Sequence, residues 1–170
     1  MKITQALLLS ILLSFTAHAS IEMTTVEPIP GRFSMDIPKG FTRIADDMLK
    51  SEASSEDGPS IAYSNESNTV NIIITHPQMP LDDDNMGLMK SIMLMGMRSY
   101  QPQAKEVMVD NKKAYIFDFV THDEKVDTQN MMLMIPFDGR ALLIVFNISK
   151  EEKEKYMGIG RSSLMSLQFK

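Results

Sequence analysis

Residues 82–100 form the one strongly helical and strongly apolar segment in the middle of a chain that otherwise has the patterns of β-strands. Acidic and amide residues, Asp82 to Asn85, precede the apolar part, and Pro102 follows it. Between them lie five methionines, two leucines and an isoleucine. A helix with this composition must bury one side, so we expect it to pack on a sheet built from the flanking strands.

The methionines form a stripe along one side of this predicted helix. At 100° per residue, the stripe consists of Met86, Met89, Met93, Met97 and, at its end, Tyr100. Methionine fills irregular gaps in a core, so we interpret the stripe as a core surface. Two alternatives stay open. Thioethers bind Cu(I), and Met131, Met132 and Met134 would add a second group of ligands. A partly exposed methionine-rich face can also dock a partner protein.

Alternating or continuous apolar runs on both sides of the helix predict strands. We expect them at residues 32–37, 41–45, 61–64, 69–75, 107–109, 114–121, 130–135 and 141–148. The last strands are apolar on both faces, which is typical of central strands covered on both sides. Ser149 and Glu152 form a capping-box pattern and predict a second helix that ends near Ser166. This order predicts an α+β fold, an antiparallel β-sheet sandwich with two main helices packed on it.

The first nineteen residues have the pattern of a secretory signal peptide. Lys2 provides the basic start, residues 3–15 are mainly apolar, and Ala17-His18-Ala19 matches a cleavage site. We expect residues 1–19 to be removed, leaving residues 20–170 as a single α+β domain. The chain contains no cysteine, which excludes a bacterial lipoprotein anchor and disulfides. We therefore expect a soluble protein exported to the bacterial periplasm.

The net charge of the chain indicates which classes of partner it is not expected to bind. The formal net charge is −5, and removal of the signal peptide would take away Lys2 but no acidic residue. An acidic chain with scattered lysines argues against binding to nucleic acid or to an anionic membrane surface. No second apolar run has the length of a membrane-spanning helix, so we expect no transmembrane segment after cleavage.

Two short motifs resemble those of the Mog1/PsbP-like superfamily. Residues 33–41, Phe-Ser-Met-Asp-Ile-Pro-Lys-Gly-Phe, resemble its opening hairpin, and residues 166–169, Ser-Leu-Gln-Phe, resemble its closing motif. The order of elements between them is similar to that of the DcrB-like bacterial branch. The resemblance implies a non-enzymatic envelope protein, although DcrB-like proteins are generally lipoproteins and this chain has no anchoring cysteine. The same fold resembles periplasmic immunity proteins that block toxins delivered by type VI secretion.

The chain carries no catalytic signature, so we expect no enzyme activity and no cofactor. His122-Asp123-Glu124 is a possible acid–base group, which we interpret as a solvated loop. Asp82-Asp83-Asp84 offers carboxylates for calcium, but no EF-hand spacing follows. We interpret these aspartates as the cap and acidic first turn of the central helix.

The acidic, serine-rich stretch 46–58 is the candidate partner-binding element, because loops on a rigid sandwich often carry function. Its candidate residues are Asp46, Asp47, Glu52, Glu56 and Asp57. The predicted function is that of a non-enzymatic periplasmic protein-binding protein, with an immunity protein that blocks a type VI secreted toxin as the narrower hypothesis. The alternatives are a DcrB-like cell-envelope accessory protein and a methionine-rich Cu(I)-binding periplasmic protein.

Overall fold

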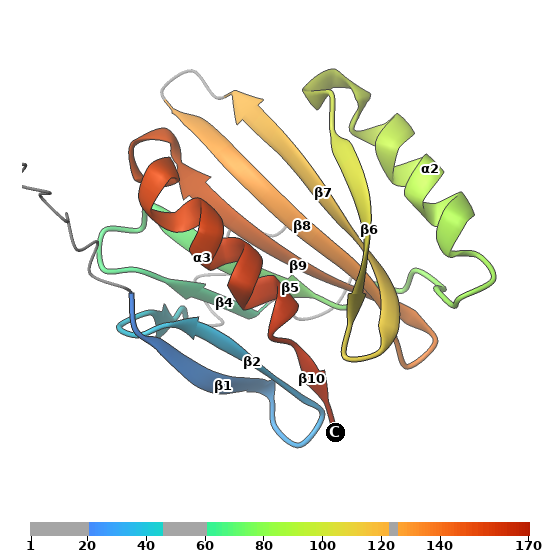
Figure 1. Cartoon of the computed structure of the whole chain (residues 1–170), viewed down its shortest axis with the longest axis horizontal. Coiled ribbons are helices and arrows are strands. Elements are labelled where there is room, and N and C mark those ends of the chain that lie inside the picture. Colours follow the sequence, from blue (N-terminus) through green and yellow to red (C-terminus); the bar gives the residue numbers. More distant parts are fainter. Residues whose placement is uncertain (1–20, 46–60, 123–125) are drawn as a thin grey trace, which may run out of the picture.

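Two antiparallel β-sheets and two α-helices make up the part of the chain that the computed structural model describes, residues 21–45, 61–122 and 126–170 (Figure 1). The larger sheet has seven strands in the order β3-β4-β5-β9-β8-β7-β6. Their bounds are β3 (Thr42–Arg43), β4 (Ile61–Ser64), β5 (Val70–Thr75), β6 (Gln103–Val109), β7 (Lys112–His122), β8 (Asp127–Phe137) and β9 (Arg140–Ser149). The predicted α+β class is confirmed, and the central placement of β8 and β9 agrees with their apolar residues on both faces.

The smaller sheet brings the two ends of the domain together. It has the order β1-β2-β10, with β1 at Met23–Ile29, β2 at Phe33–Pro38 and β10 at Gln168–Phe169. Phe169 pairs with Phe33, so the two motifs that carry the family resemblance lie side by side. Phe169 also stacks on Phe137 at the end of β8, with ring centroids 5.3 Å apart. Strand β1 was not among the strands predicted from the sequence.

The central helix is shorter than the sequence predicts. It comprises α2 (Met86–Gly96) and continues only as a 3-10 turn, η1 (Arg98–Tyr100). The Asp82 carboxylate accepts hydrogen bonds from the N–H groups of Asp84 (3.1 Å) and Asn85 (2.9 Å). Asp82 therefore caps a turn that comes before the helix, and the expected acidic first helical turn is wrong because the first turn of α2 contains no acidic residue.

The predicted capping box at the second helix is also wrong. The chain leaves β9 through a 3-10 turn, η2 (Lys150–Glu152), and the helix itself is α3 (Lys153–Met165). Ser149 makes no side-chain cap. The reason is that Ser149 still belongs to the sheet: it pairs with Thr128, and its N–H donates to the Thr69 carbonyl at 2.9 Å.

The large sheet has an apolar core on each face. On one face, α3 and the small sheet cover side chains that include Phe33, Ile72, Met131, Ile144 and Phe146. On the other face, α2 packs over side chains that include Leu81, Tyr115, Phe117, Met132 and Met134. In Figure 1, α3 crosses in front of the sheet, whereas α2 lies at the side next to β6. None of the helices in the described part of the chain has the length and apolar character needed to cross a membrane.

Candidate protein-binding site

Strand β7 extends beyond the end of its neighbour β6. The first pair between the two strands is Gln103 with Asp118, so residues 119–122 of β7 have β8 on one side only. The structure describes no strand on their other side. Pairing stops here because Gln101, the residue that would face Val120, has a left-handed backbone with a φ of 49° and so does not continue the extended strand. The end of β7 is therefore an open strand edge.

The hairpin geometry identifies which backbone groups face this edge. Asp110 and Asn111 form a two-residue turn with φ values of 47° and 61°, so Val109 and Lys112 close the hairpin as a hydrogen-bonded pair. The backbone N–H and C=O groups of successive residues in an antiparallel strand point alternately to its two neighbouring strands. Lys112 bonds to β6, so the backbone groups of all even-numbered residues of β7 point to the β6 side. Val120 thus directs its N–H and C=O to the open side.

The neighbouring residue supports this assignment. The Gln129 side-chain amide donates to the Phe119 carbonyl at 3.2 Å and to the Asn130 carbonyl at 3.4 Å. These two carbonyls therefore lie between β7 and β8, as alternation requires. By the same rule His122, the last residue of β7, also faces the open side. The edge offers backbone donors and acceptors that an added strand can use.

An open hollow of about 480 Å³ adjoins the edge. Its lining combines aromatic, amide, hydroxyl and carboxylate groups from η1 and strands β6 to β8. These residues are Ser99, Tyr100, Gln101, Gln103, Asp118, Phe119, Val120, His122 and Gln129. The rings of Tyr100 and Phe119 are 6.0 Å apart and inclined by 32°, and Tyr100 is 43% exposed. The hollow can thus receive a side chain beside the backbone groups of the edge.

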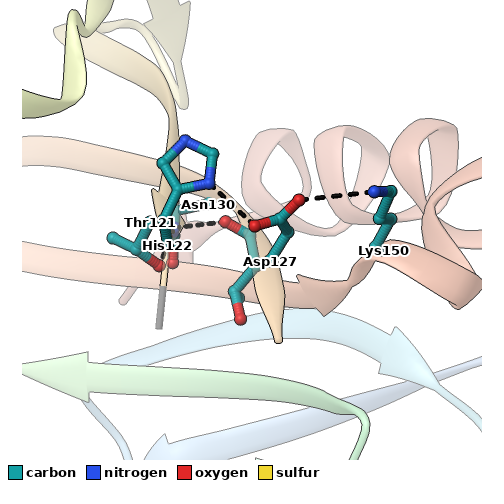
Figure 2. Close-up of polar contacts among 6 residues, drawn as sticks. Thr121, His122, Asp127, Asn130 and Lys150 are labelled. Carbon is teal, nitrogen blue, oxygen red and sulfur yellow. Dashed lines mark hydrogen bonds and ion pairs between the residues drawn. The ribbon is translucent and has the colours of Figure 1, made fainter. Parts of the chain in front are cut away.

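A polar cluster holds the end of β7 and the beginning of β8 together. Figure 2 shows Asp127 between His122 and Lys150. His122 Nδ1 lies 2.7 Å from Asp127 Oδ1, and Lys150 Nζ lies 3.4 Å from Asp127 Oδ2. The hydrogen bond from His122, and then that from Lys150, lower the pKa of the Asp127 carboxyl below its ordinary value.

The same cluster contains one residue of the acid–base group considered from the sequence. His122 is the only member of His122-Asp123-Glu124 that the structure describes, because residues 123–125 lie outside the described part of the chain. Its carboxylate partner there is Asp127. A second pair, in which the Asn130 amide donates to the Thr121 hydroxyl at 3.1 Å, ties the same two strands (Figure 2). The cluster is solvent-exposed and positions a strand end.

Neither family models nor curated protein sequences match this chain. Solved structures do. The cyanobacterial PsbP of Synechocystis sp. PCC 6803 is similar with a TM-score of 0.60 and 9% identity, over 94% of this chain and 99% of that one. Mog1p of Saccharomyces cerevisiae, a Ran-binding protein, is similar with a TM-score of 0.54 and 14% identity, over 88% and 96%. The chain has the Mog1/PsbP-like fold.

A third structure with this fold is LpqN of Mycobacterium tuberculosis, described as involved in cell envelope biogenesis. Its TM-score is 0.50 and its identity 13%, over 88% of this chain and 91% of LpqN. At these identities the Mog1/PsbP-like fold is what the likeness shows. The expected DcrB-like branch stays a prediction.

The partner-binding residues predicted from the sequence fall outside the described residues. Asp46, Asp47, Glu52, Glu56 and Asp57 all lie in residues 46–60, which the structure does not describe. The open edge of β7 was not predicted. The only sequence signal near it is Pro102, which marks the end of the central helix and directly precedes the first residue of β6.

The predicted core stripe of the central helix is packed at its four methionines but not at its end, where Tyr100 is 43% exposed. Met86 is 1% exposed, and Met89, Met93 and Met97 pack half-buried against the core under α2. This confirms the core interpretation for that side of the helix. The second group proposed for Cu(I) is split by the sheet, because Met131 lies in one core whereas Met132 and Met134 lie in the other.

Proposed function

We propose that this protein is a non-enzymatic binding protein of the bacterial periplasm that holds an extended segment of another protein against the open edge of β7. The observation that carries the proposal is the edge itself, residues 119–122, beside the hollow. In strand addition, backbone hydrogen bonds provide affinity, and pockets for alternate side chains provide specificity. The chain offers both at one place.

This edge suits strand addition better than the outer edge of β6 does. Strand β6 exposes Lys105 and Glu106, and charged residues on an edge strand discourage pairing with another chain. Residues 119–122 are Phe-Val-Thr-His and contain no lysine or acidic residue. The adjacent Tyr100 ring supplies a partly exposed aromatic surface for a side chain of the added segment.

The amino-acid sequence and the proteins of similar fold support a protein-binding role in the bacterial periplasm. The signal-peptide pattern of residues 1–19 supports export. Among proteins of similar fold, Mog1p is named a Ran-binding protein and LpqN is described as involved in cell envelope biogenesis. These names supply fold-level analogy for a protein-binding role in the envelope, and the β7 edge supplies the physical argument.

The narrower proposal is that the partner is a toxin delivered by type VI secretion, which makes this chain an immunity protein. The proposed mechanism is steric: this protein, when bound, covers a surface of the toxin that the toxin needs for its activity. An envelope accessory role of the DcrB type is the alternative, in which the partner is a resident protein of the cell envelope.

A rescue experiment separates these roles. The gene neighbouring this one is expected to encode an effector that attacks the cell wall or membrane. Cells that export this effector to the periplasm are expected to survive when the protein is co-expressed with its signal peptide. Survival no better than with an empty vector removes the immunity proposal.

The binding site is tested separately by a photo-crosslinking amino acid. Placed at Val120 on the open edge, it is expected to crosslink the partner. Placed at Ser162, an exposed position on α3, it is the matched control. Equal crosslinking from both positions contradicts the assigned site but leaves the immunity role to the rescue result.

A further inference from the structure

The outer side of α2 exposes a stripe of apolar side chains. Leu88 is 64% exposed, Ile92 44% and Met95 66%. Their spacing of four and three residues places them on one side of the helix, opposite the methionines that pack on the sheet. Single exposed apolar residues are ordinary, but an aligned set marks an interaction surface. In Figure 1, α2 lies outermost beside β6. Because Met86, Met89 and Met93 on the opposite side of α2 pack against the core, the exposed stripe faces away from the sheet.

Two opposite charges flank the apolar stripe. Asp84 lies before the first turn of α2 and Arg98 follows its last turn, and both residues are exposed. Within the described part of the chain, neither side chain forms an ion pair. The two charges are therefore available to a group outside the chain.

Five exposed residues on this side of α2 and at its two ends form a series that is complementary to the same series read backward, with Arg98 against Asp84 and Met95 against Leu88. Asp84, Leu88, Ser91, Met95 and Arg98 follow one another at intervals of four, three, four and three residues. This is the spacing of a helix–helix seam. Asp84 and Arg98 are equally distant from Ser91 in sequence, Asp84 in the turn before α2 and Arg98 in η1 after it. At the rise of an α-helix this separation corresponds to about 10 Å on either side. Leu88 and Met95 are likewise nearly balanced about it.

We propose that α2 pairs antiparallel with α2 of a second copy of this chain, around a two-fold axis at Ser91. In this arrangement Asp84 of each copy lies opposite Arg98 of the other, and Leu88 lies opposite Met95. A two-fold interface requires one surface patch that is complementary to itself. The series from Asp84 to Arg98 meets this requirement. A parallel pair would set Asp84 against Asp84 and Arg98 against Arg98, so the charges select the antiparallel arrangement.

A single helix face makes a small interface, in the class of weak complexes that bury less than about 1,200 Å². The dimer is therefore expected to form in a concentration-dependent way. Arg98 belongs to η1, whose Ser99 and Tyr100 line the hollow beside the open edge of β7. Asp84 lies at the other end of α2, so Asp84→Lys is the variant that is expected to weaken the dimer and leave partner binding at that edge intact. The two proposals can fail independently.

Charge reversal tests the pairing on the full exported protein by sedimentation velocity over a concentration series. Wild type is expected to shift from monomer toward dimer as concentration rises. Asp84→Lys and Arg98→Glu are each expected to weaken the dimer about tenfold, because each places like charges together. An equimolar mixture of the two variants is expected to restore the dimer as a heterodimer. Glu154→Lys, at an exposed position on α3, is the control and is expected to dimerise like wild type.

A crosslinking test gives the geometry. The chain contains no cysteine, so Ser91→Cys introduces its only thiol. Under mild oxidation this variant is expected to form a disulfide-linked dimer faster than Ser162→Cys on α3. A mixture of Leu88→Cys and Met95→Cys is expected to form mainly the mixed disulfide. A monomer at all concentrations, a dimer indifferent to both charge reversals, or equal crosslinking at positions 91 and 162 would overturn the proposal.

Discussion

Gly160 of α3 lies so close to Met131 of β8 that a Cβ atom added at position 160 would stand 2.4 Å from the Met131 Cε. The same atom would meet Phe146 Cδ1 of β9 at 2.8 Å. The absence of a side chain at Gly160 therefore lets α3 approach the two central strands. The other glycine of this helix, Gly158, is exposed and has no neighbour within 4 Å of such an atom.

Gly160→Ala is expected to lower the free energy of unfolding by about 1–3 kcal/mol, because the added methyl overpacks the core. Gly158→Ala is the matched control and is expected to raise it by about 0.5–1 kcal/mol, since alanine is the better helix former. Urea denaturation of both variants measures the difference. Equal stabilisation by both substitutions would contradict the close packing of α3.

Met86→Ala is expected to destabilise the protein by about 2–5 kcal/mol, because it removes a fully buried side chain under α2. Met95→Ala, on the exposed side of the same helix, is expected to change stability by less than about 0.5 kcal/mol. Thermal or urea unfolding distinguishes the two. Similar costs at both positions would argue against the division of this helix into a buried and an exposed side.

The Asp127 carboxyl is expected to titrate below its ordinary pKa of 3.8, with the His122 hydrogen bond as the main cause. His122→Ala is therefore expected to raise the pKa of Asp127 toward that value, and Lys150→Met is expected to raise it less. Because the folded-state pKa is lowered, the stabilisation is present above the unfolded value and is lost as pH falls through the folded value. Carboxyl NMR measures each pKa; an unchanged value in His122→Ala would show that the bond does not form.

The Tyr115 hydroxyl donates to Glu106 Oε2 at 3.0 Å, and this bond is the main cause that raises the pKa of Tyr115 above 10.0. Glu106→Gln is expected to lower that pKa. The sign is opposite to that of Asp127: the stabilisation is present below the unfolded value and is lost as pH rises through the folded value. Residue-specific NMR is needed because the pKa of Tyr63 is also raised, by burial. Glu151→Gln, an exposed change on η2, is expected to leave Tyr115 unaffected.

Periodicity predicted much of this fold because most of its elements bury alternate or helical faces. In β8 the continuous run Met131 to Ile135 is buried throughout, since successive side chains enter opposite cores. The predicted start of the last helix failed at Ser149 because pairing with Thr128 keeps that residue in the sheet. The local sequence pattern favoured Ser149 as a helix cap, but its long-range pairing with Thr128 determines its conformation.

The candidate site was harder to predict than the fold for a physical reason. The open edge depends on how far β7 outreaches β6, which is a property of register between two strands. Hydrophobic patterns indicate which residues form strands, but they carry little information about where pairing stops. Likewise, the sequence predicted the methionines that pack under α2, whereas the exposure of Leu88 and Met95 on its other side became evident only from the position of the sheet.

The most direct test of strand addition at β7 is the affinity of the partner for Val120→Pro. Proline removes the Val120 N–H from the open edge, where it has no strand partner among the described residues, so the fold is expected to persist. Val120→Thr keeps the N–H and is the matched control. Isothermal titration with the purified partner is expected to show at least about tenfold weaker binding for Val120→Pro and near wild-type binding for Val120→Thr. Wild-type affinity in a folded Val120→Pro variant would contradict the proposed binding mode.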